Sequence, residues 1–259
     1  MTTPSTTTGV LQDKVAVITG GGRGIGQAIA EAYDREGAIV IVSDIDGDGA
    51  ERVAKGLTRG EAAVCDVRDE AAVQALIDGI VAQHGRLDIA VANAGIGRPM
   101  PLAEMSLEEW RRVTSVNLDG VFLTIRFAAL AMAQTGGGSI IGMASITGYK
   151  GSPLIGDYAA AKAGVINLCK TAATEFRPYN VRVNAIAPTF LDTVLVQEAV
   201  PTFEAALGVP FEQIINQKQG RMGEVSDVAP LAVFLASDRS RFSTGSSFVV
   251  DNGWLASLV

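Results

Sequence analysis

A tyrosine and a lysine four residues apart are the side chains in this sequence best suited to proton transfer. Tyr158 and Lys162 would lie on one face of a helix, one turn apart. A free tyrosine hydroxyl has a pKa of about 10, and a fixed neighbouring cation lowers it by stabilising the phenolate. The pair could therefore donate or accept a proton near neutral pH. Taken alone, the spacing also fits an amphipathic helix with an unrelated tyrosine and lysine.

A glycine-rich string lies near the N-terminus, between an apolar run and a helix-like stretch. Residues 19–26 read TGGGRGIG and follow the run VAVIT at 15–19. Glycines in such a turn allow the backbone to approach a pyrophosphate, and the following helix offers free N–H groups and the positive end of its dipole. The placement between a strand and a helix predicts a dinucleotide site more strongly than the glycines alone.

The next apolar run ends in an acidic residue. Asp44 lies 18 residues after Gly26, where a carboxylate can accept hydrogen bonds from the adenosine ribose and repel a 2′-phosphate. Arg23 opposes this argument, since its guanidinium could neutralise a phosphate. Because Asp44 would face the ribose directly, we expect NAD rather than NADP.

Strand-like and helix-like segments alternate along the chain. We expect strands at 15–19, 38–43, 62–65, 87–92, 139–144, 181–186 and 246–250. We expect helices at 24–36, 47–56, 69–84, 107–134, 158–176 and 226–237. The alternation predicts one α/β domain, a Rossmann-type doubly wound, mostly parallel seven-stranded sheet with helices on both faces. This domain would span residues 11–259, after a disordered tail at 1–10.

One connection is too long for a simple turn. About thirty residues between Pro188 and Arg221 contain many apolar side chains among acidic ones, which indicates partly helical structure. Long connections in compact domains are usually functional. We expect the segment 189–220 to be a substrate loop, a mobile lid over an apolar substrate, with a surface helix pair or an oligomer contact as the alternatives.

Together, these features resemble the short-chain dehydrogenase/reductase family, over residues 14–254. Further family motifs occur in register: Asp66 in CDV, Asn93-Ala94-Gly95 after the fourth strand, Asn117 in SVNLDG and Ser145 in MASITG. The resemblance implies a catalytic set made of Asn117, Ser145, Tyr158 and Lys162. It implies that the cofactor-binding residues are Gly20, Arg23, Gly24, Ile25, Gly26, Asp44, Asp66, Val67, Asn93, Ala94, Gly95, Tyr158, Lys162, Pro188, Thr189 and Thr193.

The roles are also implied by the resemblance. Tyr158 would exchange a proton with the substrate oxygen, to which Ser145 would hydrogen-bond. Lys162 would lower the pKa of Tyr158 and bind the nicotinamide ribose, and Asn117 would hold a water in a relay to solvent. Asp66 would contact the adenine ring.

Two positions depart from the family pattern. Thr189 follows Pro188 where the family usually has glycine, so a side chain stands where backbone normally approaches the nicotinamide region. Asn252 replaces the first glycine of the common Asp-Gly-Gly, a milder change.

Composition excludes several classes of function. A net charge of −7 argues against a nucleic-acid partner. The single histidine, His84, cannot supply a multi-histidine metal site, so no metal is expected. Cys65 and Cys169 are expected to be buried free thiols. No signal peptide and no apolar segment of membrane-spanning length is predicted, which favours a cytoplasmic protein without a membrane partner. The family resemblance implies a homotetramer.

The segments expected to face a substrate are mostly apolar. We therefore expect hydride transfer between NAD(H) and a secondary alcohol or ketone on a hydrophobic or cyclic skeleton. An NADPH-dependent 3-oxoacyl-[acyl-carrier-protein] reductase is the alternative, opposed by Asp44 and the acidic balance. A non-catalytic nucleotide-binding protein of the same fold is a remote alternative.

Overall fold

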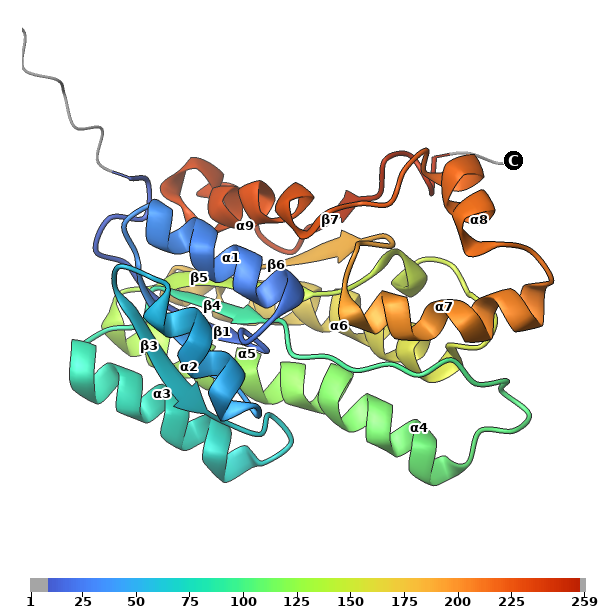
Figure 1. Cartoon of the computed structure of the whole chain (residues 1–259). Helices are drawn as coiled ribbons and strands as arrows, with labels where there is room; N and C mark the ends of the chain where they lie inside the picture. Colours follow the sequence, from blue (N-terminus) through green and yellow to red (C-terminus); the bar gives the residue numbers. More distant parts are fainter. Residues whose placement is uncertain (1–8, 257–259) are drawn as a thin grey trace, which may run out of the picture.

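Seven parallel strands form a single sheet in the computed structural model, which describes residues 9–256 (Figure 1). The strand order is β3-β2-β1-β4-β5-β6-β7, so the chain reverses direction across the sheet between β1 and β4. This is the doubly wound Rossmann arrangement predicted from the sequence. The strands are β1 (Val15–Thr19), β2 (Ile39–Asp44), β3 (Gly60–Val64), β4 (Ile89–Ala92), β5 (Gly138–Met143), β6 (Val181–Pro188) and β7 (Ser247–Val250).

Helices cover both faces of the sheet, and α1 and α9 lie opposite α3 and α5 in Figure 1. Residues of α2 share the core of α1 and α9, and residues of α6 share the core of α3 and α5. The helices are α1 (Gly24–Arg35), α2 (Gly47–Lys55), α3 (Glu70–His84), α4 (Leu107–Thr114), α5 (Gly120–Thr135), α6 (Gly156–Phe176), α7 (Val194–Leu207), α8 (Phe211–Lys218) and α9 (Ala229–Ala236).

Each strand feeds two separate cores because its side chains alternate in direction. In β1, Val15 and Val17 pack under α3, α5 and α6, while Ala16 and Ile18 pack under α1, α2 and α9. Burial on both faces explains why these strands read as continuous apolar runs rather than alternating ones. The free thiols of Cys65 and Cys169 are buried, as expected.

The N-terminal boundary differs slightly from the expectation. Most of the predicted tail, residues 1–8, lies outside the described residues. Val10, however, belongs to the domain, since its N–H donates to the Glu36 carboxylate at 2.9 Å.

The longest helical segment corrects one expectation about membranes. Residues 107–135 form one continuous helix of α4, a π-helical turn η1 (Ser115–Asp119) and α5, which is long and apolar enough to cross a membrane. The sequence reading missed this because it judged only the shorter apolar stretch around Arg126. More than half of the apolar part is buried inside the domain, and core residues such as Phe127 and Met132 pack against the sheet and α6.

The long connection after β6 folds into the helix pair α7 and α8, as its apolar pattern indicated. A third, small core holds the pair together, built around Ile155, Phe203, Phe211 and Ile215. Figure 1 shows both helices at the end of the domain away from β3.

A buried carboxylate ties β1 to the start of β4. Asp88 is 7% exposed, and its Oδ2 accepts hydrogen bonds from the Val15 N–H at 2.9 Å and from Arg86 Nε at 2.8 Å. Arg86, whose side chain is half-exposed, also donates to Oδ1, and Lys14 Nζ lies 3.7 Å from the same oxygen, at the edge of the sheet opposite the glycine loop.

Asp88→Ala should therefore lower the free energy of unfolding by about 1 to 3 kcal/mol, because it leaves the buried N–H of Val15 without an acceptor. Urea denaturation measures the loss. Asp78→Ala, on the exposed side of α3, should change stability by less than about 0.5 kcal/mol. Equal losses in the two variants would contradict this role for Asp88.

Candidate functional site

The predicted site residues gather at one edge of the sheet, because the carboxyl ends of parallel strands all meet there. The glycine-rich loop follows β1, and Asp44 ends β2. Asn93 follows β4, Ser145 follows β5, and Pro188 ends β6. The centre of this edge lies between β1 and β4, where the strand order reverses and doubly wound sheets bind ligands.

The glycine-rich loop leaves no room for side chains. Gly20 and Gly24 have φ angles of 63° and 57°, a region that L side chains rarely adopt. A β-carbon at Gly20 would lie 2.7 Å from the Ala94 Cα, and one at Gly26 would lie 2.7 Å from Asn93 Nδ2. The N-terminus of α1, at Arg23, has no side-chain cap, so its first N–H groups remain available to an anion. The loop therefore fits a pyrophosphate group.

Asn93 holds the first residues of the glycine-rich loop through its side-chain amide. Its Nδ2 donates to the carbonyl oxygens of Thr19 and Gly20, both at 3.0 Å. The Thr19 hydroxyl in turn accepts from the N–H groups of Asn93 and Ala94, at 3.1 and 3.3 Å. The turns after β1 and β4 are thus locked to each other. Sequence reasoning did not assign Thr19 a role, although it opens the glycine string.

Asp44 closes the adenosine side of the loop. Its Oδ2 accepts from the Gly22 N–H at 2.9 Å, and its Oδ1 accepts from the Asp46 N–H at 3.0 Å. Each oxygen keeps acceptor capacity for ribose hydroxyls. Arg23 is exposed, whereas Arg52, which sequence reasoning missed, donates to the Gly22 carbonyl at 2.6 Å. No spacing rule would have found Arg52, because α2 alone brings it to the loop.

Asp66 already has a partner within the chain. Its carboxylate forms a two-pronged pair with Arg68, through Nε at 2.9 Å and Nη2 at 2.6 Å. This hydrogen bond and charge lower the pKa of Asp66. Val67 is buried and packs so closely on α5 that a β-carbon at Gly120 would lie 2.6 Å from its Cγ2.

Asn117 occupies the π-helical turn between α4 and α5, a feature that is frequent at functional sites. Its side chain is fully buried and clamps the loop after β4: Oδ1 accepts from the Ile96 N–H at 3.0 Å, and Nδ2 donates to the Ile96 carbonyl at 2.6 Å. A β-carbon at Gly95 would lie 2.6 Å from the same Oδ1. The side chain of Asn117 therefore shapes the floor of the site.

Lys162 places a charged group in the core. The side chain is 2% exposed, and its Nζ donates to the Met143 carbonyl at 2.7 Å. The same Nζ lies 5.4 Å from the centre of the Tyr158 ring, as the helical spacing predicted. Burial lowers the pKa of Lys162 to about 8.

The pKa of Tyr158 differs from the sequence-based expectation. Burial raises it to about 12, and a hydrogen bond with the Ser145 hydroxyl opposes the rise only in part. Lys162 does not lower the pKa of Tyr158 within the chain alone, and its ammonium donates instead to the Met143 carbonyl. The structure thus joins the partly buried Tyr158 to the buried side chains of Ser145 and Lys162 in one cluster.

Asp157, which sequence reasoning also missed, steadies the start of α6. The carboxylate is buried, and its Oδ1 accepts from the N–H of Tyr158 at 2.7 Å. Burial raises the pKa of Asp157, an effect that this hydrogen bond partly opposes.

The residues after β6 adjoin both the glycine loop and the tyrosine. The Thr193 Cγ2 lies 3.8 Å from the position of a β-carbon at Gly24. A β-carbon at Gly97 would lie 3.5 Å from the Tyr158 ring and 3.7 Å from Leu195 Cδ1. The start of α7 therefore borders the glycine loop on one side and Tyr158 on the other.

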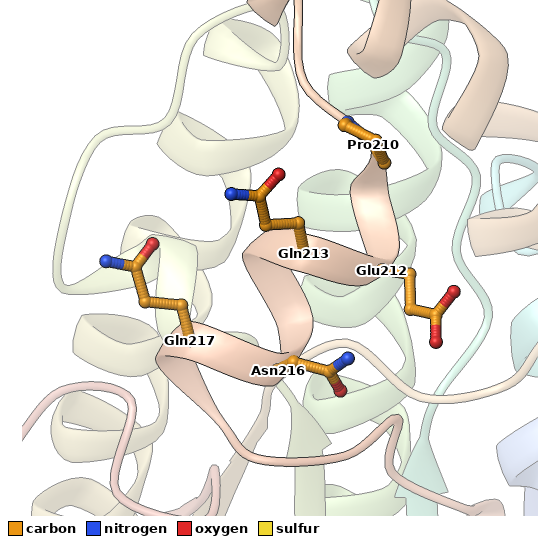
Figure 2. Close-up of a pocket in the computed structure, with 5 residues that line it drawn as sticks. All are labelled: Pro210, Glu212, Gln213, Asn216 and Gln217. Carbon is orange, nitrogen blue, oxygen red and sulfur yellow. The ribbon is translucent and has the colours of Figure 1, made fainter.

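A separate hollow of about 540 Å³ lies on the outer side of α8 and contains none of these residues (Figure 2). It is lined by side chains that project outward from the helix, namely Pro210, Glu212, Gln213, Asn216 and Gln217. The buried side of α8 carries Phe211 and Ile215 instead.

Comparisons with known proteins identify the family. A family model described as enoyl-(acyl carrier protein) reductase matches residues 20–255. A crystal structure of a short-chain type dehydrogenase/reductase from Mycobacterium marinum superposes with a TM-score of 0.87 at 36% identity, covering 95% of this chain and 97% of that one. The chain belongs to the short-chain dehydrogenase/reductase family.

Two curated family members show the range of chemistry among its relatives. The cis-4-hydroxycyclohexanecarboxylate dehydrogenase of Sinomonas cyclohexanicum is 39% identical over 94% of this chain and 97% of its own length. The NADP-dependent (R)-specific alcohol dehydrogenase of Lentilactobacillus kefiri is also 39% identical, over 95% of this chain and 98% of its own length. As a member of this family, the protein is an oxidoreductase of the dehydrogenase/reductase type.

The lowered pKa of Lys162 makes stability depend on pH. Below about pH 8 the lysine is charged in both states, and the cost of burying the charge is fully present. Between about pH 8 and the ordinary lysine pKa, the folded protein has lost the proton while the unfolded chain keeps it. Stability therefore rises with pH across this window.

Relative to Lys162→Met, the wild-type free energy of unfolding should rise by about 2 to 3 kcal/mol between about pH 7.5 and about pH 10. Chemical denaturation of both proteins at several pH values measures the change. Lys170→Met, at an exposed position of α6, serves as the control. The difference in free energy of unfolding between wild type and Lys170→Met should not change with pH. A constant difference between wild type and Lys162→Met would show that the buried lysine does not titrate in this window.

Proposed function

We propose that this family member transfers a hydride between NAD(H) and a secondary alcohol or ketone, with Tyr158 as the proton-transfer residue. The observation that carries the proposal is the cluster of the partly buried Tyr158 with the buried Ser145 and Lys162 at the carboxyl edge of the sheet, beside a loop that fits a pyrophosphate. A bound nicotinamide supplies or accepts the hydride.

The chain's own residues would manage the proton and the orientation of the substrate. Tyr158 Oη would give its proton to a carbonyl oxygen or take one from an alcohol, and Ser145 would hold the same oxygen by a hydrogen bond. Lys162, fixed by the Met143 carbonyl, would bind the nicotinamide ribose and add positive charge to the site. Asn117 would keep the floor of the site in place through its two hydrogen bonds to Ile96. From its helical turn, Asn117 would also hold a water in a relay to solvent.

Specific residues would hold the dinucleotide. The pyrophosphate would contact the glycine loop, with Gly20, Gly24, Ile25 and Gly26, and Arg23 at its exposed side. The ribose would bind Asp44, and the adenine would lie near Asp66 and Val67. The turn with Asn93, Ala94 and Gly95 would support the adenosine side, and the nicotinamide end would contact the segment with Pro188, Thr189 and Thr193.

The apolar wall around Tyr158 favours a hydrophobic or cyclic substrate. Tyr158 packs against the third core together with Leu154, Ile155 and Val196, and Leu195 borders the same space. An apolar pocket selects by shape and by removing apolar surface from water. The relative that acts on a hydroxycyclohexane carboxylate supports a ring-shaped substrate.

Tyr158→Phe should lower kcat for oxidation of secondary alcohols by a factor of about 10² to 10⁴, because it removes the only proposed acid–base group and leaves the ring in place. The rate of NADH formation with a panel of secondary alcohols measures the effect. Tyr179→Phe, at an exposed tyrosine distant from the site, should retain the wild-type rate. Full turnover by Tyr158→Phe would rule out the proposed role.

Asp44 is the basis for proposing NAD. We expect kcat/KM with NAD to exceed that with NADP by at least about tenfold, since the carboxylate would repel the 2′-phosphate. Asp44→Ala should narrow this ratio, whereas Asp48→Ala, which removes an equal charge from an exposed position of α2, should leave it unchanged. A wild-type preference for NADP would overturn the NAD proposal and favour the 3-oxoacyl carrier-protein reductase alternative.

The homotetramer expected from the family stays a proposal, and exposed apolar side chains support it. Phe122 and Leu130 on α5 are each 44% exposed, and Phe234 on α9 and Val249 on β7 are 37% and 41% exposed. Covering these groups in subunit contacts would remove apolar surface from water. Light scattering should give four times the 26.9 kDa mass of the chain, and the mass of one chain would contradict the proposal.

A further inference from the structure

The helices α7 and α8 leave and rejoin the domain through two neighbouring segments. Residues 189–192 and 219–223 lie side by side, and Leu191 pairs with Gly223 in a parallel bridge. The C-terminal segment 250–254 adjoins both. We call these three segments the neck of the α7–α8 pair.

A buried amide holds the three segments of the neck together. Gln219 is 2% exposed, and its Oε1 accepts from the Thr189 hydroxyl at 2.8 Å. Its Nε2 donates to the carbonyl oxygens of Phe190 at 2.9 Å and Arg221 at 2.7 Å. The backbone carbonyl of Gln219 accepts from Asn252 Nδ2 at 2.6 Å. One residue thus bonds to every segment of the neck, and its side-chain amide forms three hydrogen bonds.

Thr189 and Asn252, the two residues that depart from the family pattern, both form hydrogen bonds with Gln219. Thr189 and Asn252 stand where the family usually has glycine, and a glycine at either position would have no side chain to bond with Gln219. Asn252 adopts a φ of 46°, which asparagine tolerates better than most residues. The two substitutions therefore share one structural consequence, a polar lock at the neck.

The lock holds the aromatic centre of the helix pair. The carbonyl oxygen of Phe190 accepts a hydrogen bond from Gln219 Nε2. The Phe190 ring packs edge-on against Phe203 and Phe211, at 6.2 and 5.1 Å between ring centres. The same ring lies 5.4 Å from that of Trp254 in the C-terminal segment. Movement at the neck would therefore shift the packing of α7 and α8.

The start of α7 connects the neck to the site around Tyr158. Only three residues separate Phe190 from Val194, where α7 begins. Leu195 on its first turn approaches Tyr158 across Gly97, as the 3.7 and 3.5 Å separations above show. The position of α7 thus sets how much room a substrate has beside the Tyr158 ring.

We propose that Gln219 is a positioning residue for substrate specificity, acting through the neck to hold Leu195 at a fixed place beside Tyr158. The proposal rests on the proposed alcohol dehydrogenase function. With the lock intact, the apolar wall is preformed and fits a ring. Without it, α7 is free to shift, and the site loses its preference for a bulky cyclic alcohol over a small open-chain one.

The test compares substrates within each variant, because a ratio does not depend on the fraction of folded enzyme. Gln219→Met keeps the size of the side chain and removes its three hydrogen bonds. We expect it to lower kcat/KM for cyclohexanol about tenfold relative to kcat/KM for 2-butanol. Asn252→Gly removes one hydrogen bond of the lock and should lower the ratio of kcat/KM for cyclohexanol to that for 2-butanol by a smaller factor. This variant provides the test if Gln219→Met does not fold.

Ser139→Ala is the matched structural control. It removes one buried hydrogen bond, from the Ser139 hydroxyl to the Leu235 carbonyl at 2.7 Å, at the opposite end of β5. It should leave the substrate ratio at the wild-type value. If Gln219→Met also leaves the ratio unchanged, the residue is merely structural and the proposal is wrong.

Limited proteolysis separates failure of this proposal from failure of the proposed function. If the wild type oxidises neither alcohol with NAD or NADP, the function proposal fails. The rate of protease cleavage within 194–218 then tests whether Gln219 holds the neck together. Faster cleavage there in Gln219→Met than in Ser139→Ala supports the lock, and equal rates overturn it.

Discussion

The burial of the Lys162 ammonium is the constraint on which the rest of the site depends. A charge in the core is tolerated only where fixed acceptors compensate its lost hydration. Here the Met143 carbonyl at the end of β5 accepts its hydrogen bond, and the Tyr158 ring lies beside it. Gly95 lacks a side chain that would crowd this space and collide with Asn117. The elements β4, β5, α5 and α6 must therefore meet in one arrangement.

The two halves of the site are connected through the ends of the strands. On the nucleotide side, Asn93 locks the turn after β4 to the glycine loop after β1. On the substrate side, the segment after β6 passes Thr193 beside that loop and then presents Leu195 near Tyr158. The glycine loop proposed for the dinucleotide and the apolar wall beside Tyr158 thus share the same edge of the sheet.

Periodicity and local motifs predicted the sheet, its order of elements and the placement of Tyr158 over Lys162, because these depend on short-range pattern and on parallel topology. Contacts between distant segments were not predictable. Arg52 reaches Gly22 only through the packing of α2, and Gln219 meets Thr189 and Asn252 only because three distant segments converge. The upward shift of the Tyr158 pKa was missed for the same reason, since burial outweighs the hydrogen bond with Ser145 and burial is a property of the whole fold.

The central claim, that Tyr158 is the proton-transfer group beside the positively charged nicotinamide ring of an oxidised dinucleotide, is tested most directly by titrating its hydroxyl. The difference in tyrosinate absorbance between wild type and Tyr158→Phe isolates this residue from the other three tyrosines. In the free protein Tyr158 should stay protonated to about pH 12. Saturating oxidised NAD should move the ionisation of Tyr158 to lower pH, because the positive charge of the nicotinamide ring beside the hydroxyl would favour the phenolate. The same titration curve with and without the dinucleotide would contradict the account.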